Sequence, residues 1–386
     1  MRAGSFSGLV RAAALPYHPP GMSPFTAPPD APPDAMHAPP SSQRAAAPRI
    51  PGAREQVLPA AENLFKATLV IALLLGSFAA AGRIAKAADA SALSYNAALA
   101  VTWGAAALLA LVNGVLVTAM IALAHDAVHR VLFPSAFWNE TWGGILSGLS
   151  LVPFHANRQF HLTHHGYAHQ PVLDPEAAMH NHAFLYAATV GSFIGIREQY
   201  RIFFRNLAHA GDPRFTGRAL RDLGFVAFAA AFYFGLPPAL GIPLHLTVLP
   251  MLLVFPLVFS FRALSDHYGI PATETRAAAR QDIVDAGADS WSAGSDRRQA
   301  EVSGWVVLTA PWLEWLWSHV NYHEVHHKYP YLSHRYMPEV FAATRDRHPY
   351  LVVRGYWRSV AHLCRRGYYA SPDEVRRYRW QDDRTP

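Results

Sequence analysis

Three short histidine clusters are the residues of this sequence best suited to chemistry. Eight of the 21 histidines fall into them, with the spacings H-x3-H, H-x2-H-H and H-x2-H-H. The eight are His125, His129, His161, His164, His165, His323, His326 and His327. On a helix, residues i and i+4 share a face, and the spacing H-x2-H-H covers an arc of about 100°. Each cluster therefore predicts a helical face of imidazoles, and neutral imidazole is the commonest protein ligand of metals.

The number of clustered imidazoles favours two metal ions over one. A zinc site takes about four protein ligands, so eight or nine imidazoles exceed the needs of a single ion. Imidazole suits iron, zinc, copper and nickel, and the spacing leaves the metal open. The single cysteine, Cys364, excludes an intrachain disulfide, a four-cysteine zinc site and an iron–sulfur cluster ligated by this chain alone.

The elements that must position these histidines are predicted to be membrane-spanning helices. Residues 97–124 and 223–261 contain no Asp, Glu, Lys or Arg over 28 and 39 positions. One crossing takes about 20 apolar residues, and prolines near the middle of the longer run predict a turn there. The pattern predicts four crossings, at about 64–86, 97–124, 221–240 and 244–265.

Basic residues predict the orientation of these crossings. Of the 33 lysines and arginines, 25 lie in two places: between the second and third crossings, and from Arg262 to the C-terminus. By the positive-inside rule these regions and the N-terminus are cytoplasmic, and all three histidine clusters lie on that side. We expect an all-α integral membrane protein with four transmembrane helices in two hairpins. A cytoplasmic helical cap would carry the di-metal histidine site. The alanine- and arginine-rich composition suggests a GC-rich coding sequence, and we expect a bacterial inner membrane.

Composition also predicts the domain organisation. Eleven of the 30 prolines precede residue 50, which predicts a disordered Pro/Ala-rich tail over 1–60, a membrane domain over 61–345 and a basic cytoplasmic tail over 346–386. The apolar stretches 143–154 and 183–196 are too short to span and are expected to be interfacial or re-entrant. A tryptophan-rich stretch is expected to anchor in the headgroup layer. Its tryptophans are Trp305, Trp312, Trp315 and Trp317.

At the histidine clusters the chain resembles the membrane fatty acid desaturase/hydroxylase superfamily. That pattern has H-x3-H, H-x2-H-H and H-x2-H-H in order, with a transmembrane hairpin between the second and third boxes. The flanking residues agree, and the resemblance covers about residues 64–345. They include Asn139-Glu140, Gly143-Gly144, Asp174-Pro175-Glu176 and Asn321-Tyr322.

The resemblance implies a non-haem di-iron centre held by the eight boxed histidines. In this superfamily a further ligand often follows the fourth crossing, where this chain has His267. An asparagine ligand of acyl-CoA desaturases corresponds to Ala263, so no asparagine is carried over. A ligating imidazole usually donates its other N–H to a carboxylate or carbonyl. The carboxylates expected in that role are Asp126, Asp174, Asp266 and Glu324.

The implied activity is O2-dependent desaturation of a lipid acyl chain. No His-Pro-Gly-Gly haem motif and no cysteine cluster occurs in the sequence. We therefore expect electrons from a separate carrier (a ferredoxin, a rubredoxin or a cytochrome b5-like protein), and no nucleic acid partner. A hydroxylase or ketolase of a lipid or carotenoid is the alternative with the same di-iron centre. A histidine-rich metal transporter or a catalytically silent relative is a further alternative, although transport would need ligands near the bilayer midplane.

Overall fold

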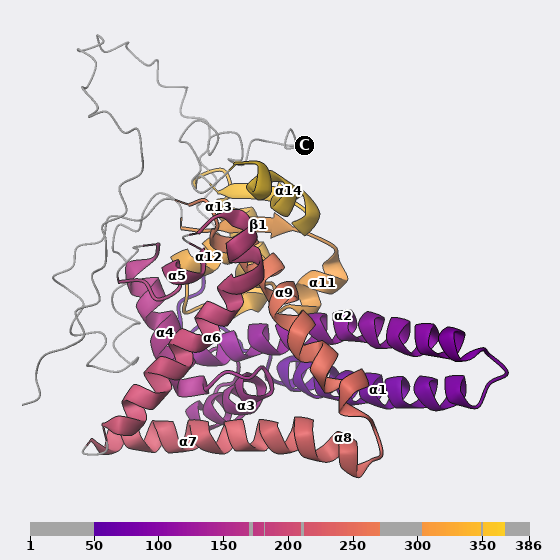
Figure 1. The fold of residues 1–386 in the computed structure, drawn as a ribbon. Helices are drawn as coiled ribbons and strands as arrows, with labels where there is room; N and C mark the ends of the chain where they lie inside the picture. Colours follow the sequence, from indigo (N-terminus) through magenta and orange to yellow (C-terminus); the bar gives the residue numbers. More distant parts are fainter. Residues whose placement is uncertain are drawn as a thin grey trace, which may run out of the picture. The chain divides into compact units, whose positions relative to one another are not determined.

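The computed structural model describes residues 50–169, 173–180, 182–209, 212–270, 303–348 and 350–366. Within these residues the chain is mostly helical (Figure 1). The predicted N-terminal tail lies outside the described residues up to position 49, and the predicted C-terminal tail lies outside them from position 367.

Four helices are long and apolar enough to cross a membrane, as the sequence predicts. Two of them are α1 (Ala60–Asp89) and α2 (Tyr95–Val128), of 30 and 34 residues. The third spans Phe215–Ala239 and the fourth Leu244–His267. The third combines most of α7 (Pro213–Ala230), the π-helix η1 (Ala231–Gly235) and α8 (Leu236–Ala239). The fourth combines the 3-10 turn η2 (Leu244–Leu246) and α9 (Val248–His267).

The first two spans pack along each other, whereas the other two diverge from their short connection (Figure 1). Helix α7 packs chiefly against α3 (Ala136–Leu149) and α6 (Phe184–Ala208), and α9 packs chiefly against α2 and α6. Glycines allow these close approaches, because a Cβ on Gly114 would come within 2.8 Å of Val258 and one on Gly148 within 2.7 Å of the Phe225 carbonyl oxygen. The packing fixes the ends of α2 and α9, which carry histidines.

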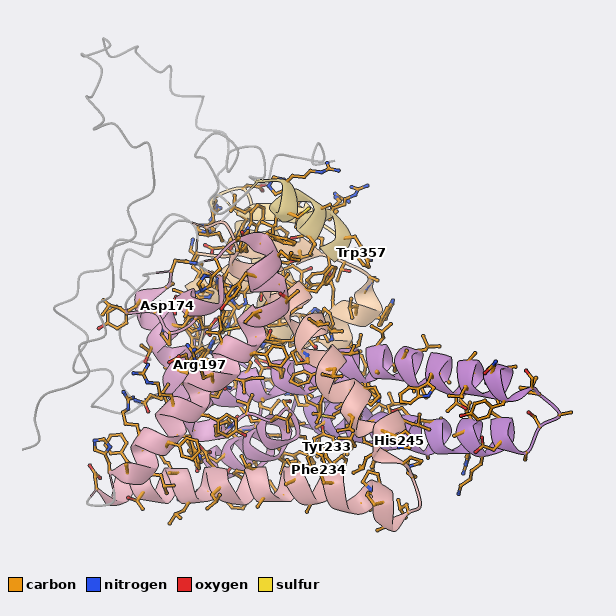
Figure 2. All side chains as sticks on the ribbon, viewed as in Figure 1. Asp174, Arg197, Tyr233, Phe234, His245 and Trp357 are labelled. Carbon is orange, nitrogen blue, oxygen red and sulfur yellow. The ribbon has the colours of Figure 1, made fainter. Side chains whose placement is uncertain are left out.

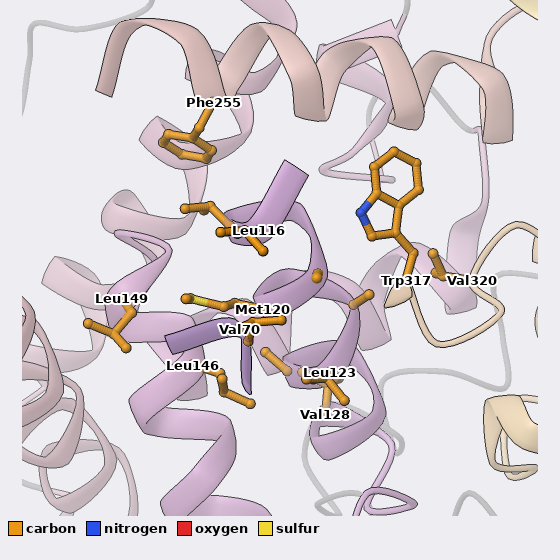
Figure 3. Close-up of a cluster of buried hydrophobic side chains, with 14 of the residues drawn as sticks. Val70, Leu116, Met120, Leu123, Val128, Leu146, Leu149, Phe255, Trp317 and Val320 are labelled. Carbon is orange, nitrogen blue, oxygen red and sulfur yellow. The ribbon is translucent and has the colours of Figure 1, made fainter. Parts of the chain in front are cut away.

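The main apolar core lies around the C-terminal half of α2. Figure 3 shows Leu116, Met120 and Leu123 of α2 between Phe255 of α9 and Leu146 of α3. Each of these side chains is at most 4% exposed. Because α2 is held on several sides, the histidine at its C-terminal end has a fixed position.

The expectation of an all-α fold is wrong in one detail, a small parallel sheet. Strand β1 (Trp305–Leu308) pairs with β2 (Leu351–Arg354), with Val306 opposite Val352. Short apolar runs rich in valine favour strands, and here the first three residues of each strand are buried. Strand β2 and helix α14 (Tyr356–Arg366) lie in the segment predicted as a C-terminal tail, and the pairing attaches that segment to the folded domain.

The tryptophan-rich stretch does not behave as one membrane anchor. Trp305 is only 1% exposed, and Trp317 is 4% exposed with its Nε1–H donated to the Val115 carbonyl oxygen. Trp312 remains 64% exposed. The headgroup interpretation is therefore wrong for Trp305 and Trp317, because both belong to the main core.

Helices α3 and α6 contain most of the two short apolar stretches. Helix α6 has 25 residues because it continues past the predicted stretch through the charged residues Arg197, Glu198 and Arg201. It is not among the four candidate spans found in the described residues. The remaining helices are short and cluster near the histidines. They are α4 (Phe154–Tyr167), α5 (Ala177–His180), α11 (Pro311–Leu316), α12 (His323–Lys328), η5 (His334–Tyr336) and α13 (Met337–Thr344).

Candidate metal centre

Four helices bring all nine predicted histidines into two adjoining groups. Helix α2 supplies His125 and is followed directly by His129, and α9 ends at His267. Helices α4 and α12 each supply one H-x2-H-H cluster. Within each group one ring nitrogen per residue lies within 4.8 Å of the others. The first group is His125, His129, His161, His165 and His326; the second is His164, His267, His323 and His327.

Helical spacing produces the shortest contacts within each cluster. The Nε2 atoms of His161 and His165 are 2.9 Å apart, and those of His323 and His327 are 3.1 Å apart. Both pairs are i and i+4 on a helix, as expected from the sequence. The remaining neighbours come from different helices, so tertiary packing completes each group.

The distances between Nε2 atoms fit the edges of a metal coordination shell. His129 lies 3.0 Å from His161, His326 lies 3.0 Å from His165, and His323 lies 2.7 Å from His267. Cis ligands at a metal–nitrogen distance of about 2.1 Å are roughly 3 Å apart. Where Nδ1 carries the proton, facing Nε2 lone pairs repel unless a cation lies between them. The donor set therefore fits two metal ions, one with five imidazoles and one with four.

His161, His164 and His267 each have a described hydrogen-bond partner at Nδ1. His161 donates to Glu176 at 3.0 Å, His164 to Asp174 at 2.9 Å and His267 to the Ser303 carbonyl oxygen at 3.3 Å. A donated Nδ1–H fixes the tautomer and leaves the Nε2 lone pair available for a metal. Asp174 is itself held by the backbone N–H groups of His169 and Glu176. Figure 2 labels Asp174 at the end of the domain opposite the connection between α1 and α2.

Asp174 is the one predicted carboxylate that bonds a boxed histidine in the described residues. Asp126 instead bonds Nδ1 of His334. Asp266 pairs with Arg262 at 2.6 Å and lies 3.8 Å from Nδ1 of His323, beyond hydrogen-bond range.

Glu324 was the remaining carboxylate predicted to support a boxed imidazole. It accepts from His348 at 2.9 Å and from the Ser303 backbone at 2.7 Å. Glu324 directly follows His323 on helix α12, and the side chains of neighbouring helical residues differ in direction by about 100°. The Glu324 side chain therefore points away from the face that carries the histidines. It joins α12 to distant segments.

Two residues near the centre were missed from the sequence. Glu176 accepts the Nδ1–H of His161, which is the role expected of a partner carboxylate. The sequence feature that could have indicated it is its position two residues after Asp174. His334 stacks on His326 with ring centroids 5.3 Å apart and, with His125 and Asp126, forms a third group of potential ligands. No repeated spacing marks His334 in the sequence.

Burial keeps most of the cluster neutral. Burial lowers the pKa of His129, His165 and His327 well below the usual value, and nearby imidazoles lower it further. Burial also lowers the pKa of His164, but Asp174 and Glu176 outweigh this effect and raise it to about 9. The same two carboxylates would stabilise a metal cation at Nε2 of His164, because either a proton or a metal places positive charge on the ring.

A cavity of about 100 Å³ adjoins the two groups. His125, His161, His267 and His323 are part of its wall. Apolar residues of the membrane-spanning helices form another part. They include Ile121 and Ala122 of α2 and Phe255 and Phe259 of α9. The cavity therefore lies between the histidines and apolar side chains of the candidate membrane-spanning helices.

A family model described as fatty acid desaturase matches residues 101–358, which is more than half of the chain. The matched range contains all nine histidines, the sheet and the cavity. A search of curated proteins gave no match. The family is one of oxidoreductases that act on lipids at membranes, in agreement with the four apolar helices. Because the family model matches more than half of the chain, and the matched range contains the buried histidine groups, this chain belongs to the fatty acid desaturase family.

Proposed function

We propose that this protein is an O2-dependent di-iron oxidoreductase that desaturates a lipid acyl chain with electrons from a separate carrier. The observation that carries the proposal is the pair of imidazole groups, of five and four residues, beside a cavity that extends between apolar helices. The family match supplies the reaction class. The three histidine boxes alone do not distinguish desaturation from hydroxylation, since both begin by removing a hydrogen atom.

Iron fits both the imidazole ligands and the redox chemistry of an oxidoreductase. Imidazole also binds zinc and copper, but zinc has no redox chemistry, and the resemblance of the histidine boxes implies iron rather than copper. Two iron ions at this site would supply the electron transfer that activates O2. The ligands proposed are the five histidines of the first group and the four of the second.

The protein residues would hold the reacting groups and exclude water. Asp174 and Glu176 fix the ring orientation of His164 and His161 through their Nδ1 atoms. The boxed histidines His164, His326 and His327 are each 1% exposed, so the centre is shielded from bulk solvent. The apolar cavity wall would align a lipid chain beside the centre, and alignment within about 1 Å matters greatly for the rate.

The proposed reaction balances with two electrons and two protons. One O2 accepts them, together with two hydrogens from adjacent carbons, and yields two waters and a carbon–carbon double bond. A hydroxylation with the same inputs yields one alcohol and one water. Cys364 is the single cysteine of the printed sequence, so a distinct protein is the proposed source of electrons.

Lipid mass spectrometry of cells with and without the gene tests the reaction. We expect products lighter than their precursors by two hydrogens. Purified protein should contain about two iron ions per chain, which distinguishes an enzyme from a silent relative. A gain of one oxygen, with label from 18O2, would replace desaturation by the hydroxylase alternative.

We further propose that both termini and the metal centre are cytoplasmic. The arginine distribution supports this orientation. The connection after α1 and the turn after α8 both lie away from α4, α5 and α12 (Figure 1). Reporter fusions at residues 90 and 240 should be external, and fusions at 175 and 380 cytoplasmic. An external reporter at 175 would contradict this topology, since it would place the second histidine cluster outside.

A further inference from the structure

Besides the proposed ligands His125 and His323, five residues that line the cavity each have a buried polar atom without a hydrogen-bond partner in the described part of the chain. These five residues come from α3, α5, α6 and α9, and each residue is at most 9% exposed. The atoms are Ser147 Oγ, His180 Nδ1, Gln199 Oε1, Arg262 Nε and Asp266 Oδ1. In folded proteins most buried polar atoms have partners, so five around one cavity indicate a site that binds a polar group.

A purely alkyl chain would suit this cavity poorly. A buried donor or acceptor left unpaired is costly, and water that satisfies it can be displaced favourably only by a group that reproduces its hydrogen bonds. The apolar residues, such as Ile121 and Phe255, suit an alkyl chain, whereas Gln199 and Ser147 suit a hydrogen-bonding group. The wall thus matches a lipid that has both.

The side chains of the wall favour a polar group that can donate as well as accept hydrogen bonds. Arg262 is the one lysine or arginine among the described residues that line the cavity, and Asp266 pairs with it at 2.6 Å. Glu176 also lines the cavity and is bonded to His161. A carboxylate or phosphate group accepts hydrogen bonds but does not donate them, so it would leave the acceptors Gln199 Oε1 and Asp266 Oδ1 unsatisfied.

The unpartnered atoms include both donors and acceptors. Arg262 Nε–H can only donate, whereas Gln199 Oε1 can only accept. The Ser147 hydroxyl can do either. A hydroxyl or an amide group can donate and accept at once, and so matches this set.

We propose that the substrate is a lipid with a hydroxyl or amide group that binds inside this cavity, close to the carbon that is oxidised. Asp266 directly precedes His267 on α9, and Arg262 is paired with Asp266, so a group bound to them lies near the second histidine group. This proposal rests on the proposed function, since it names the class of lipid that the same site takes.

Equilibrium binding to the purified, metal-loaded protein tests the proposal. Labelled hexadecanamide in detergent micelles is displaced by unlabelled hexadecanamide, 1-hexadecanol or hexadecane. We expect the amide and the alcohol to bind about tenfold more tightly than hexadecane, as one or two hydrogen bonds would give. Because no O2 or electron donor is present, the result does not depend on whether the protein desaturates, hydroxylates or is silent.

Variants link the preference to the cavity. Gln199→Leu removes the acceptor at similar volume and should reduce the affinity for hexadecanamide about tenfold while leaving that for hexadecane unchanged. Gln159→Leu is the matched control, because Gln159 bonds Asn206 and lines a different cavity. Ser147→Ala serves if Gln199→Leu fails to fold. Equal binding of hexadecane to the wild type overturns the proposal, as does a variant that weakens all three compounds equally or none.

Discussion

Replacing His267 with alanine should abolish turnover and remove part of the bound iron. His267 Nε2 lies 2.7 Å from Nε2 of His323, and its Nδ1–H faces the Ser303 carbonyl oxygen. Its loss would leave three imidazoles in the second histidine group. We expect product formation to fall more than about 100-fold, since loss of a mere hydrogen-bond partner of a ligand already costs roughly 10–100-fold. Iron per chain by elemental mass spectrometry, beside a product assay, measures both effects.

His245→Ala is the matched control for this variant. His245 begins the same candidate span, in the turn η2, and its ring lies 5.9 Å from that of Trp103. Figure 2 labels it near the connection between α8 and α9, far from Asp174. It should retain iron and turnover. Full iron content and full turnover in His267→Ala would show that His267 is not a ligand.

The histidine groups could be predicted because most of their geometry is local. A spacing of four residues fixes a shared helical face, whatever the remainder of the chain does. Thus His161 with His165, and His323 with His327, lie close in the structure as their spacing predicts. Apolar runs likewise predict crossings, since the bilayer imposes their length. Tertiary packing then brings the distant clusters together. This agrees with the two crossings predicted between the second and third clusters, because an even number of crossings returns the chain to the same side of the membrane.

The partners of the ligands could not be predicted, because they depend on the path of loops. Glu176 and Asp126 are both acidic residues near a box, yet one bonds His161 and the other His334. Similarly, β2 contains a run of three apolar residues, Leu351–Val353, and its partner strand β1 lies more than 40 residues earlier in the chain. Strand pairing of this kind is non-local, and a short apolar run does not by itself identify its state.

The polar residues of the cavity wall also could not be predicted from the sequence. Gln199, Ser147 and His180 lie on three different helices, and each alone resembles an ordinary polar residue of an amphipathic helix. Only their joint burial around one cavity gives them meaning. By contrast, the tail predicted over residues 346–386 rests on their basic charge. Leu351–Val353 lie within that range but are apolar and buried in strand β2, so the charge of the whole segment does not determine the structure at these three residues.

Removing the metal should markedly destabilise the protein. The histidine groups contain nine buried or half-buried imidazoles, with Nε2 atoms of different residues 2.7–3.2 Å apart. Without a cation several of these nitrogens must remain unpaired or repel, at about 1–3 kcal/mol for each unsatisfied group. A loss of at least about 5 kcal/mol would lower the midpoint of thermal unfolding by roughly 10 °C. Size-exclusion chromatography of heated protein in detergent, before and after chelation, measures the shift.

Restoring ions one at a time makes this test specific. Fe2+ should return the midpoint to its initial value, whereas Mg2+ should not, because Mg2+ prefers oxygen ligands. The His267→Ala variant should lose less on chelation than the wild type, since its second group starts incomplete. His245→Ala should lose as much as the wild type. An unchanged midpoint after nearly complete metal removal would mean that these histidines hold no structural metal, because nine converging imidazoles stable without an ion must satisfy one another by protonation and hydrogen bonds alone.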